Sequence, residues 1–182
     1  RRADIMIVNF PPPARERPPG TPQVAIGEIG LDRWMLERAR PDDPRLAGLR
    51  RAPLEEQRDV FVWQLALAAE RNLPVTVHCL EAWGPLAEIL RRGPLPRRGF
   101  LLHAYNGSAE MAREFAALGA YFSFNGAFLA ERHAARRTVF QTLPRDRLLV
   151  ETDAPAMPPP EDRRTYSLPN SPDGRVLNHP AT

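Results

Sequence analysis

The sequence predicts an α/β fold in which helices cover a parallel sheet, and three observations support this class. Five short apolar runs of strand length recur along the 182 residues, and helical patterns lie between or around them. The runs are apolar over most of their length, as buried parallel strands are. Apolar residues make up 43% of the chain, which excludes a disordered protein. Strand and helix alternate at the spacing of an open parallel sheet or a parallel barrel.

The predicted strands are short and end near glycine, proline or polar residues. Before them, residues 5–8 are compatible with one further buried strand, and residues 11–22 read as an extended proline-rich linker. Residues 1–22 are therefore predicted to form an atypical N-terminal segment. The five strands of the sheet are predicted at residues 23–28, 74–78, 99–103, 120–124 and 147–153.

Four helices are predicted from apolar spacing and from helix-end residues. In the first, apolar side chains share one face at helical spacing: Leu54, Phe61, Leu65 and Ala68. Another begins after Ser108, a good N-cap, and stops at Gly119, a good residue to follow a helix. The predicted helices span residues 53–71, 84–92, 108–118 and 131–141.

Amino-acid composition says more about the cellular compartment of the protein than about its function. The net charge is +3, and the 25 basic residues are all arginine. Arginine binds phosphate well, but the arginines are spread along the chain among nearly as many acids, which favours a GC-rich genome as the explanation. One cysteine fits a reducing cytoplasm. We expect no signal peptide and no membrane span, because no apolar run approaches roughly 20 residues.

Four of the five predicted strands finish on a side chain that can bind a metal ion. Because the carboxyl ends of parallel strands meet at one edge of a sheet, these side chains are expected to converge. Imidazole and carboxylate ligands together suit Zn²⁺ or Mn²⁺ better than a pure Mg²⁺ site. Taken singly, a histidine at a strand end is more often structural, and a glutamate after glycine can cap a helix. The joint pattern favours a metal site at Glu28, His78, His103 and Asp153.

Four motifs in register resemble one known family. GEIGLD (27–32), PVTVHCLEAWG (74–84), GFLLHAYNGS (99–108) and LLVETDAP (148–155) occur in this order and at fitting intervals. Together they resemble the TatD family of metal-dependent hydrolases, in the amidohydrolase superfamily of (β/α)8 barrels. LNHPA (177–181) is similar to that family's Asn-Glu-Pro segment. The resemblance implies a TIM-barrel type of α/β fold, incomplete here, over residues 23–182.

The resemblance also implies an activity: metal-dependent hydrolysis of phosphodiesters in DNA, often as a 3′ exonuclease. Glu28 matches a ligand that can bridge two ions, and His78 and His103 match ligands of the second ion. Asp153 matches the ligand of the first ion that helps to activate water. The implied cofactor is one or two divalent ions (Mg²⁺, Mn²⁺ or Zn²⁺), which lower the pKa of bound water and neutralise phosphate charge. The implied partner is DNA or another phosphodiester.

One departure from the family concerns the first metal ion. The family begins with a His-x-His pair, which this sequence lacks, and the residues before Gly27 are too few for three strand–helix units. The chain therefore looks truncated at both ends. Glu28, His78 and His103 would still form a three-ligand site, so we expect one ion of moderate affinity and weak or no nuclease activity. A half-open barrel would expose apolar strand edges and favour self-association, although the oligomeric state stays open.

Other departures concern the substrate. Leu80 stands where the family often has an arginine, while Tyr105 keeps an aromatic ring that could stack on a base. Arg33 and Arg163 follow two of the motifs and are candidates for substrate contact, with a solvent-facing loop as the alternative. Two other functions stay open: hydrolysis of a C–N or ester bond in a small molecule, and a non-catalytic binding module.

Two residues beside the predicted ligands are expected to have supporting roles. Glu151 is predicted to support Asp153, because alternation in a strand turns both to the same side. Alternation also turns Cys79 away from His78, so the thiol is expected to pack in the core rather than bind metal.

Overall fold

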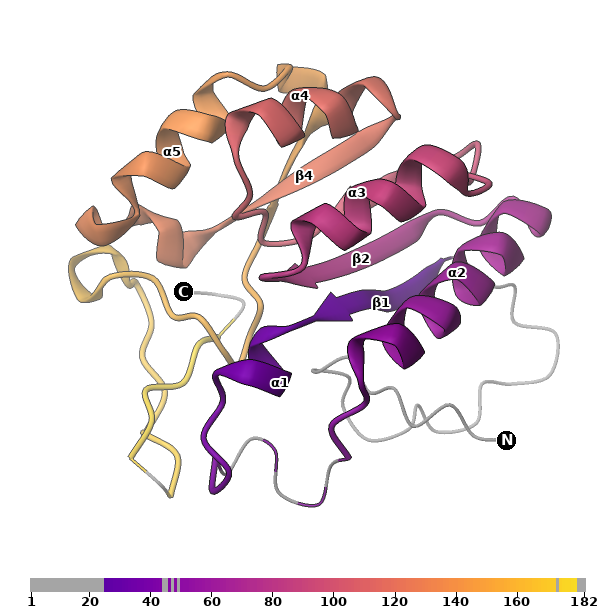
Figure 1. Ribbon diagram of the computed structural model, residues 1–182. Helices are drawn as coiled ribbons and strands as arrows, with labels where there is room; N and C mark the ends of the chain where they lie inside the picture. Colours follow the sequence, from indigo (N-terminus) through magenta and orange to yellow (C-terminus); the bar gives the residue numbers. More distant parts are fainter. Residues whose placement is uncertain (1–24, 44–45, 47, 49, 173, 180–182) are drawn as a thin grey trace, which may run out of the picture. The chain divides into compact units, whose positions relative to one another are not determined.

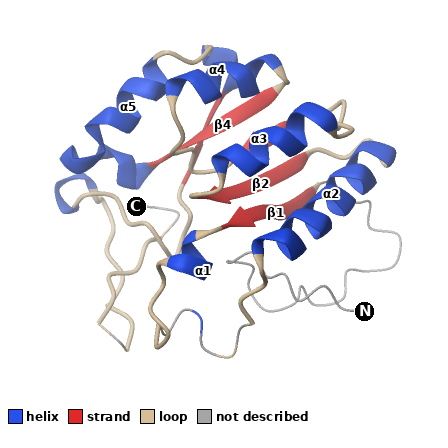
Figure 2. Cartoon of the chain, in the orientation of Figure 1, coloured by secondary structure: helices blue, strands red, loops and turns tan. Residues whose placement is uncertain are grey.

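A computed structural model describes residues 25–43, 46, 48, 50–172 and 174–179. These residues form two compact units, the first ending at Leu101 and the second starting at Leu102. Figure 2 shows that strands and helices alternate within each unit. The predicted strand at 5–8 and the predicted linker at 11–22 lie outside the described residues, and the single barrel domain over 23–182 stays a prediction.

The first unit is built on parallel strands covered by helices. Strands β1 and β2 pair in parallel, with Gly30 opposite His78. Figure 1 shows α2 running along β1, and the two elements pack together; α3 packs on β2. The unit contains β1 (Ile26–Asp32), α1 (Trp34–Glu37), α2 (Leu54–Glu70), β2 (Val75–Leu80), α3 (Trp83–Arg92) and most of β3 (Phe100–Leu102).

Helix α2 confirms the helix predicted at 53–71, and its buried face explains how it holds β1. Phe61, Leu65 and Ala68 are fully buried, as their spacing predicts. Burying a side chain the size of Phe61 or Leu65 contributes about 1.5–3 kcal/mol. A polar residue, Gln57, lies on the same buried face, whereas Leu54 is only half-buried. The amide of Gln57 therefore has to find partners inside the protein.

The second unit repeats the arrangement of strand and helix. Strands β4 and β5 pair in parallel, with Asn125 opposite Glu151, and α4 packs on β4. Ser108 caps α4 as predicted, its hydroxyl accepting a hydrogen bond of 3.2 Å from the backbone N–H of Met111. The unit contains α4 (Ala109–Ala117), β4 (Ala120–Asn125), η2 (Gly126–Leu129), η3 (Glu131–His133), α5 (Ala134–Gln141), η4 (Arg145–Arg147), β5 (Leu148–Glu151) and η5 (Glu161–Arg163).

Aromatic rings fill much of the core of the second unit. Tyr105 meets Phe122 edge-to-face at 5.1 Å between ring centroids, and Phe124 meets Phe140 in the same way at the same distance. Edge-to-face pairs of this kind add about 0.5–1.5 kcal/mol beyond the area they bury. After β5 the described chain is drawn almost entirely as loop (Figure 2), so this segment depends on side-chain anchors for its shape.

The strands are placed differently along the sequence from the prediction. Strand β1 continues past Glu28 to Asp32, β2 continues past His78 to Leu80, and β5 ends at Glu151. The prediction ended each of these three strands at a potential ligand and so put the ligands at strand ends. In β1 the apolar alternation resumes after Glu28, and a register shift between Ile26 and Ile29 inserts an extra residue there. Bulges of this kind re-aim side chains, which is how a carboxylate is accommodated inside the strand.

Gly30 has a backbone conformation that depends on its being glycine. Its φ is +147°, and a Cβ built at this position would lie 1.9 Å from the carbonyl oxygen of His78. Real Cβ atoms essentially never come closer than 3.0 Å to such a neighbour. The first unit therefore requires a residue without a side chain directly beside His78.

Strand β5 carries exposed apolar side chains. Leu149 is 46% exposed and Val150 is 86% exposed. Exposed apolar residues on a strand are sites at which another chain can pair or pack, so self-association stays a prediction. Among the helices that the structure describes, none combines the length and the apolar character that crossing a membrane requires.

Candidate metal centre

In the first unit, His78 lies between two carboxylates of the neighbouring strand. Its Nδ1 atom is 3.3 Å from Oε1 of Glu28, and its Nε2 atom is 3.2 Å from Oδ2 of Asp32. The strand register explains this arrangement, because His78 pairs with Gly30 and the two acids come two residues to either side. Side chains two apart share one face of a strand. The side chains of Glu28 and His78 are 13% and 16% exposed.

Asp32 is a residue of this group to which the sequence analysis gave no role. It ends β1, is 8% exposed, and accepts a hydrogen bond of 2.8 Å from the backbone N–H of Met35. The signal was present in GEIGLD, where Glu28, Gly30 and Asp32 alternate as acid, glycine and acid. Ending the strand at Glu28 concealed that alternation.

In the second unit, His103 follows β3 and lies against Glu151. Its Nδ1 atom is 3.6 Å from Oε1 of Glu151. The same carboxylate accepts hydrogen bonds from the hydroxyl of Ser123 and, at 3.4 Å, from the amide of Asn125. Burial raises the pKa of Glu151, but the hydrogen bonds from His103 and Ser123 outweigh it and hold the pKa below its ordinary value. Glu151 thus remains an ionised acceptor that can orient His103.

Asp153 lies on a loop that follows β5 and has a φ of +55°, a left-handed conformation that aspartate tolerates better than most residues. The loop is tied to the end of the described chain. The buried amide of Asn178 donates to the carbonyl of Thr152 at 2.5 Å and to that of Met157 at 3.3 Å. The backbone N–H of Asn178 donates to the carbonyl of Pro155 at 2.9 Å. Asn178, the second residue of LNHPA, therefore supports the loop that carries Asp153.

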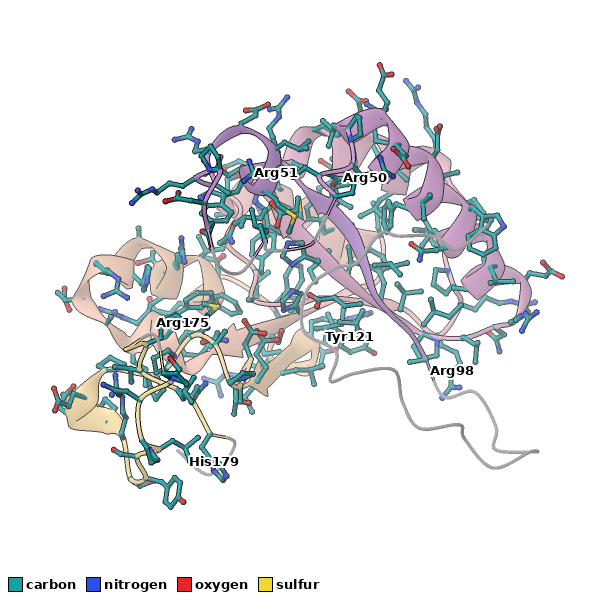
Figure 3. All side chains as sticks on the ribbon, turned by 90° about the horizontal axis from the view of Figure 1, so that it is seen from below. Arg50, Arg51, Arg98, Tyr121, Arg175 and His179 are labelled. Carbon is teal, nitrogen blue, oxygen red and sulfur yellow. The ribbon has the colours of Figure 1, made fainter. Side chains whose placement is uncertain are left out.

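The histidine after Asn178 lies close to an aromatic ring. Figure 3 labels His179 on the C-terminal segment, and its ring centroid is 4.8 Å from that of Tyr166. The side chain of Tyr166 is itself nearly half exposed.

The predicted substrate contacts differ in their surroundings. Arg33 precedes α1 and forms an ion pair with Glu37, with its side chain 42% exposed. Arg163 is exposed and pairs with Asp162 at 3.2 Å. Tyr105 is 1% exposed, and its hydroxyl donates to the carbonyl of Ser108, so its place in the core argues against the predicted stacking on a base.

Cys79 packs in the core, as predicted. Its side chain is buried and forms no disulfide, and burial raises the pKa of its thiol far above the ordinary value. A thiol in that state is a poor metal ligand, because the thiolate is the form that binds metal.

The donor types fit a transition-metal ion. Glu28, His78 and His103 offer one carboxylate and two imidazoles, and all three side chains are partly buried. Glu28 and His78 belong to the first unit and His103 to the second. Mixed nitrogen and oxygen donors of this kind suit Zn²⁺ or Mn²⁺. The role predicted for Asp153 stays a prediction.

Comparison with known proteins identifies the family. The family described as "TatD related DNase" matches residues 20–174. The chain belongs to this family. The E. coli TatD homologue YjjV, a solved structure, is similar with a TM-score of 0.62 and 37% identity, covering 76% of this chain and 48% of that one. The predicted fold class, an α/β fold of the TatD barrel type present in part, is confirmed.

Curated relatives of this TatD-family chain have related names. "Uncharacterized metal-dependent hydrolase YabD" of Bacillus subtilis is 36% identical, covering 75% of this chain and 48% of the relative. "3'-5' ssDNA/RNA exonuclease TatD" of Cronobacter sakazakii is 36% identical, covering 78% and 51%. "Deoxyribonuclease TATDN3" of Homo sapiens is 34% identical, covering 78% and 46%. The chain thus spans about half the length of the curated relatives it matches.

Proposed function

We propose that this chain carries a metal centre of a hydrolase that cleaves phosphodiester bonds in DNA from the 3′ end. The observation that carries the proposal lies in the first unit, where Nδ1 of His78 and Oε1 of Glu28, both within the TatD motifs, are 3.3 Å apart; His103 is the third ligand that the family resemblance implies. The names of the relatives, which include a 3′-5′ exonuclease and a deoxyribonuclease, support the substrate class.

The first unit offers a test of whether its residues fit a cation. Oε1 of Glu28 and Nδ1 of His78 are 3.3 Å apart, and both side chains are partly buried. A carboxylate oxygen and an unprotonated imidazole nitrogen are both acceptors, so a proton or a cation must lie between them for the contact to be favourable. The residues present therefore fit a divalent ion.

The mechanism assigns one role to each side chain. A bound divalent ion lowers the pKa of its water and neutralises charge on the phosphate. Glu28, His78 and His103 would hold and orient that ion, and Glu151 would fix the orientation of the His103 ring by accepting a hydrogen bond from its Nδ1–H. Asp153 accepts a proton from the attacking water at a carboxylate oxygen. The anchored loop after β5 limits how far Asp153 can move, since Asn178 ties the backbone of Thr152.

A nuclease assay with metal controls tests the proposal. Single-stranded DNA labelled at the 5′ end is incubated with the protein and Mn²⁺, Zn²⁺ or Mg²⁺, in parallel with simple ester and amide substrates. We expect at most weak, stepwise shortening from the 3′ end, which stops when EDTA removes the metal. His103→Ala should abolish it, whereas His133→Ala, a matched histidine substitution outside the ligand set, should not. Cleavage that survives EDTA, or hydrolysis of esters or amides alone, would overturn the DNA proposal.

Metal binding is measured separately from cleavage, because the chain spans only about half the length of its relatives and can bind an ion without being active. Isothermal titration with Mn²⁺ or Zn²⁺ should show one ion of moderate affinity, which His103→Ala weakens. Two tight sites, or none, would contradict the expected three-ligand centre. Binding of one ion without cleavage of any substrate would favour a binding module over an enzyme.

We also propose that the protein works in the cytoplasm. The single cysteine, Cys79, is free and buried, as expected in a reducing compartment. Cell fractionation followed by immunodetection checks the location, and recovery in an extracellular or periplasmic fraction would contradict it.

A further inference from the structure

The ring of His78 lies between two carboxylates, with one near each of its ring nitrogens. Nε2 is within hydrogen-bond distance of Oδ2 of Asp32, at 3.2 Å, and Nδ1 lies 3.3 Å from Oε1 of Glu28. A neutral imidazole carries one N–H and one lone pair, and the partner of one nitrogen determines which nitrogen keeps the proton. The carboxylate that is more firmly fixed therefore decides which ring nitrogen of His78 keeps the proton and which is left to bind a cation.

Asp32 is fixed through both its backbone and its side chain. The side-chain amide of Gln57 clamps the backbone of Asp32 through two hydrogen bonds. Its Oε1 accepts from the Asp32 N–H at 2.7 Å, and its Nε2 donates to the Asp32 carbonyl at 3.2 Å. The Asp32 carboxylate is fixed at its other oxygen, Oδ1, by the N–H of Met35. Asp32 and Gln57 are 8% and 7% exposed, so water competes little for these hydrogen bonds.

The clamp is itself attached to the rest of the first unit. Nε2 of Gln57 also donates to the carbonyl of Ala52 at 2.9 Å, just before α2 begins. On the same helix face, Phe61 and Leu65 are fully buried and keep α2 against β1. Gln57 is therefore a buried polar residue whose side-chain acceptor and donors are all used on the backbone of Asp32 and of Ala52. An apolar residue at this position would suit the packing of α2 but would leave the backbone of Asp32 without these partners.

We propose that Asp32, clamped by Gln57, is a positioning residue for His78. It keeps an N–H on Nε2 and turns Nδ1 toward Glu28, where a divalent cation binds. An ionised carboxylate can only accept a hydrogen bond, so Nε2 must be the donor. A metal-binding histidine commonly donates its other N–H to such a carboxylate, and loss of that partner typically weakens metal affinity by about 10–100-fold. The cation part of this proposal rests on the proposed function; the tautomer part does not.

The tautomer is measured first, in the metal-free wild-type protein. Long-range ¹H–¹⁵N correlation spectra at pH 8 report which ring nitrogen of His78 carries the proton, and we expect Nε2. A ring protonated at Nδ1 alone would overturn the proposal. Because this measurement needs neither metal nor substrate, it distinguishes failure of the positioning role from failure of the nuclease function.

Variants then separate positioning from charge. Asp32→Asn is expected to give a mixture of tautomers and 10–100-fold weaker binding of Mn²⁺ or Zn²⁺ by titration calorimetry. Asp32→Glu keeps the charge but misplaces the carboxylate, and should also lose affinity. Gln57→Met leaves every charge in place and should lose affinity by a smaller factor. Asp59→Asn removes an exposed carboxylate from the same helix and is the matched control.

The results that contradict the role are specific. If Asp32→Glu binds metal as tightly as the wild type while Asp32→Asn does not, Asp32 acts through its charge alone. If folded Asp32→Asn keeps the wild-type tautomer and an affinity within about twofold, Asp32 does not position His78. Thermal unfolding of each variant shows whether it is folded. If Asp32→Asn does not fold, the wild-type tautomer and the affinity of Gln57→Met decide.

Discussion

Replacement of Gly30 by alanine tests the close approach of β1 to β2. The new Cβ would lie 1.9 Å from the carbonyl oxygen of His78, so one of the two strands must move by roughly 1 Å or more to reach even 3.0 Å. The φ of +147° is also strained for any residue with a side chain. Overpacking costs about 1–3 kcal/mol and a residue held in a sparsely populated backbone region about 1–3 kcal/mol.

We therefore expect Gly30→Ala to lower the free energy of unfolding by roughly 4 kcal/mol, the sum of the middles of these two ranges. For a chain of this size, 1 kcal/mol corresponds to about 2–4 °C in Tm, so the expected loss is about 8–16 °C. Thermal unfolding followed by circular dichroism measures it. The same substitution should disturb metal affinity, because the carbonyl that must move belongs to His78.

Two other glycines serve as controls. Gly119 has a φ of +95°, and an added Cβ would have nothing within 4 Å, so Gly119→Ala reports backbone strain without a clash. Gly84 lies in the first turn of α3 with the same open space around an added Cβ, and Gly84→Ala should be neutral or stabilising by up to about 1 kcal/mol. A Gly30→Ala protein that melts no lower than Gly119→Ala would refute the argument from the close approach.

Three further substitutions have expected outcomes. Ser108→Ala removes the cap of α4 and should cost about 1 kcal/mol, or about 2–4 °C in Tm; an unchanged Tm would contradict the capping role. Arg50→Met should raise the pKa of Glu56 in a ¹³C NMR titration, because the hydrogen bond from Arg50 is the largest cause of its lowered pKa. Because the pKa of Glu56 is lower in the folded protein, its ion pair stabilises the fold at any pH above the ordinary pKa of glutamate. That contribution to stability is lost as the pH falls through the pKa of the folded state. Asn178→Ala should speed amide exchange in the loop after Thr152, measured by mass spectrometry, and unchanged exchange would mean the loop needs no such anchor.

The helices were predictable because their signals are local. Ser108 marks the start of α4 through its side-chain cap, and Gly119 marks its end through a left-handed backbone. Each signal depends on a single residue type. The buried face of α2 follows from apolar spacing. Helix α1 was not predicted, since four residues are too few to show a helical period.

The strand ends were harder to predict because strand pairing is not local. A polar residue in an apolar run looks like the end of a strand, but Glu28 and His78 lie inside β1 and β2. The partner strand and the extra residue in β1 decide where those side chains point, and neither can be read from a single segment.

The sequence predicted the residue types of the candidate site, which stay a prediction, but it did not predict their supporting contacts. Glu28, His78 and His103 were identified from their chemistry and their order along the chain. Gln57 was missed because a glutamine in an apolar helix face carries no signal of its partner 25 residues away. Tyr105 was assigned to substrate from its motif, but its depth in the core depends on packing with Phe115 and Phe122.

The buried thiol of Cys79 gives this protein a natural reporter. It is the one cysteine of the sequence, follows His78 in β2, and is 4% exposed. A maleimide added to the intact protein should react with this thiol only when β2 transiently opens, so the labelling rate reports how often β2 opens. Any ligand that holds the imidazole of His78 in place should slow that reaction. The rate of thiol labelling would then report ligand binding on the opposite face of β2.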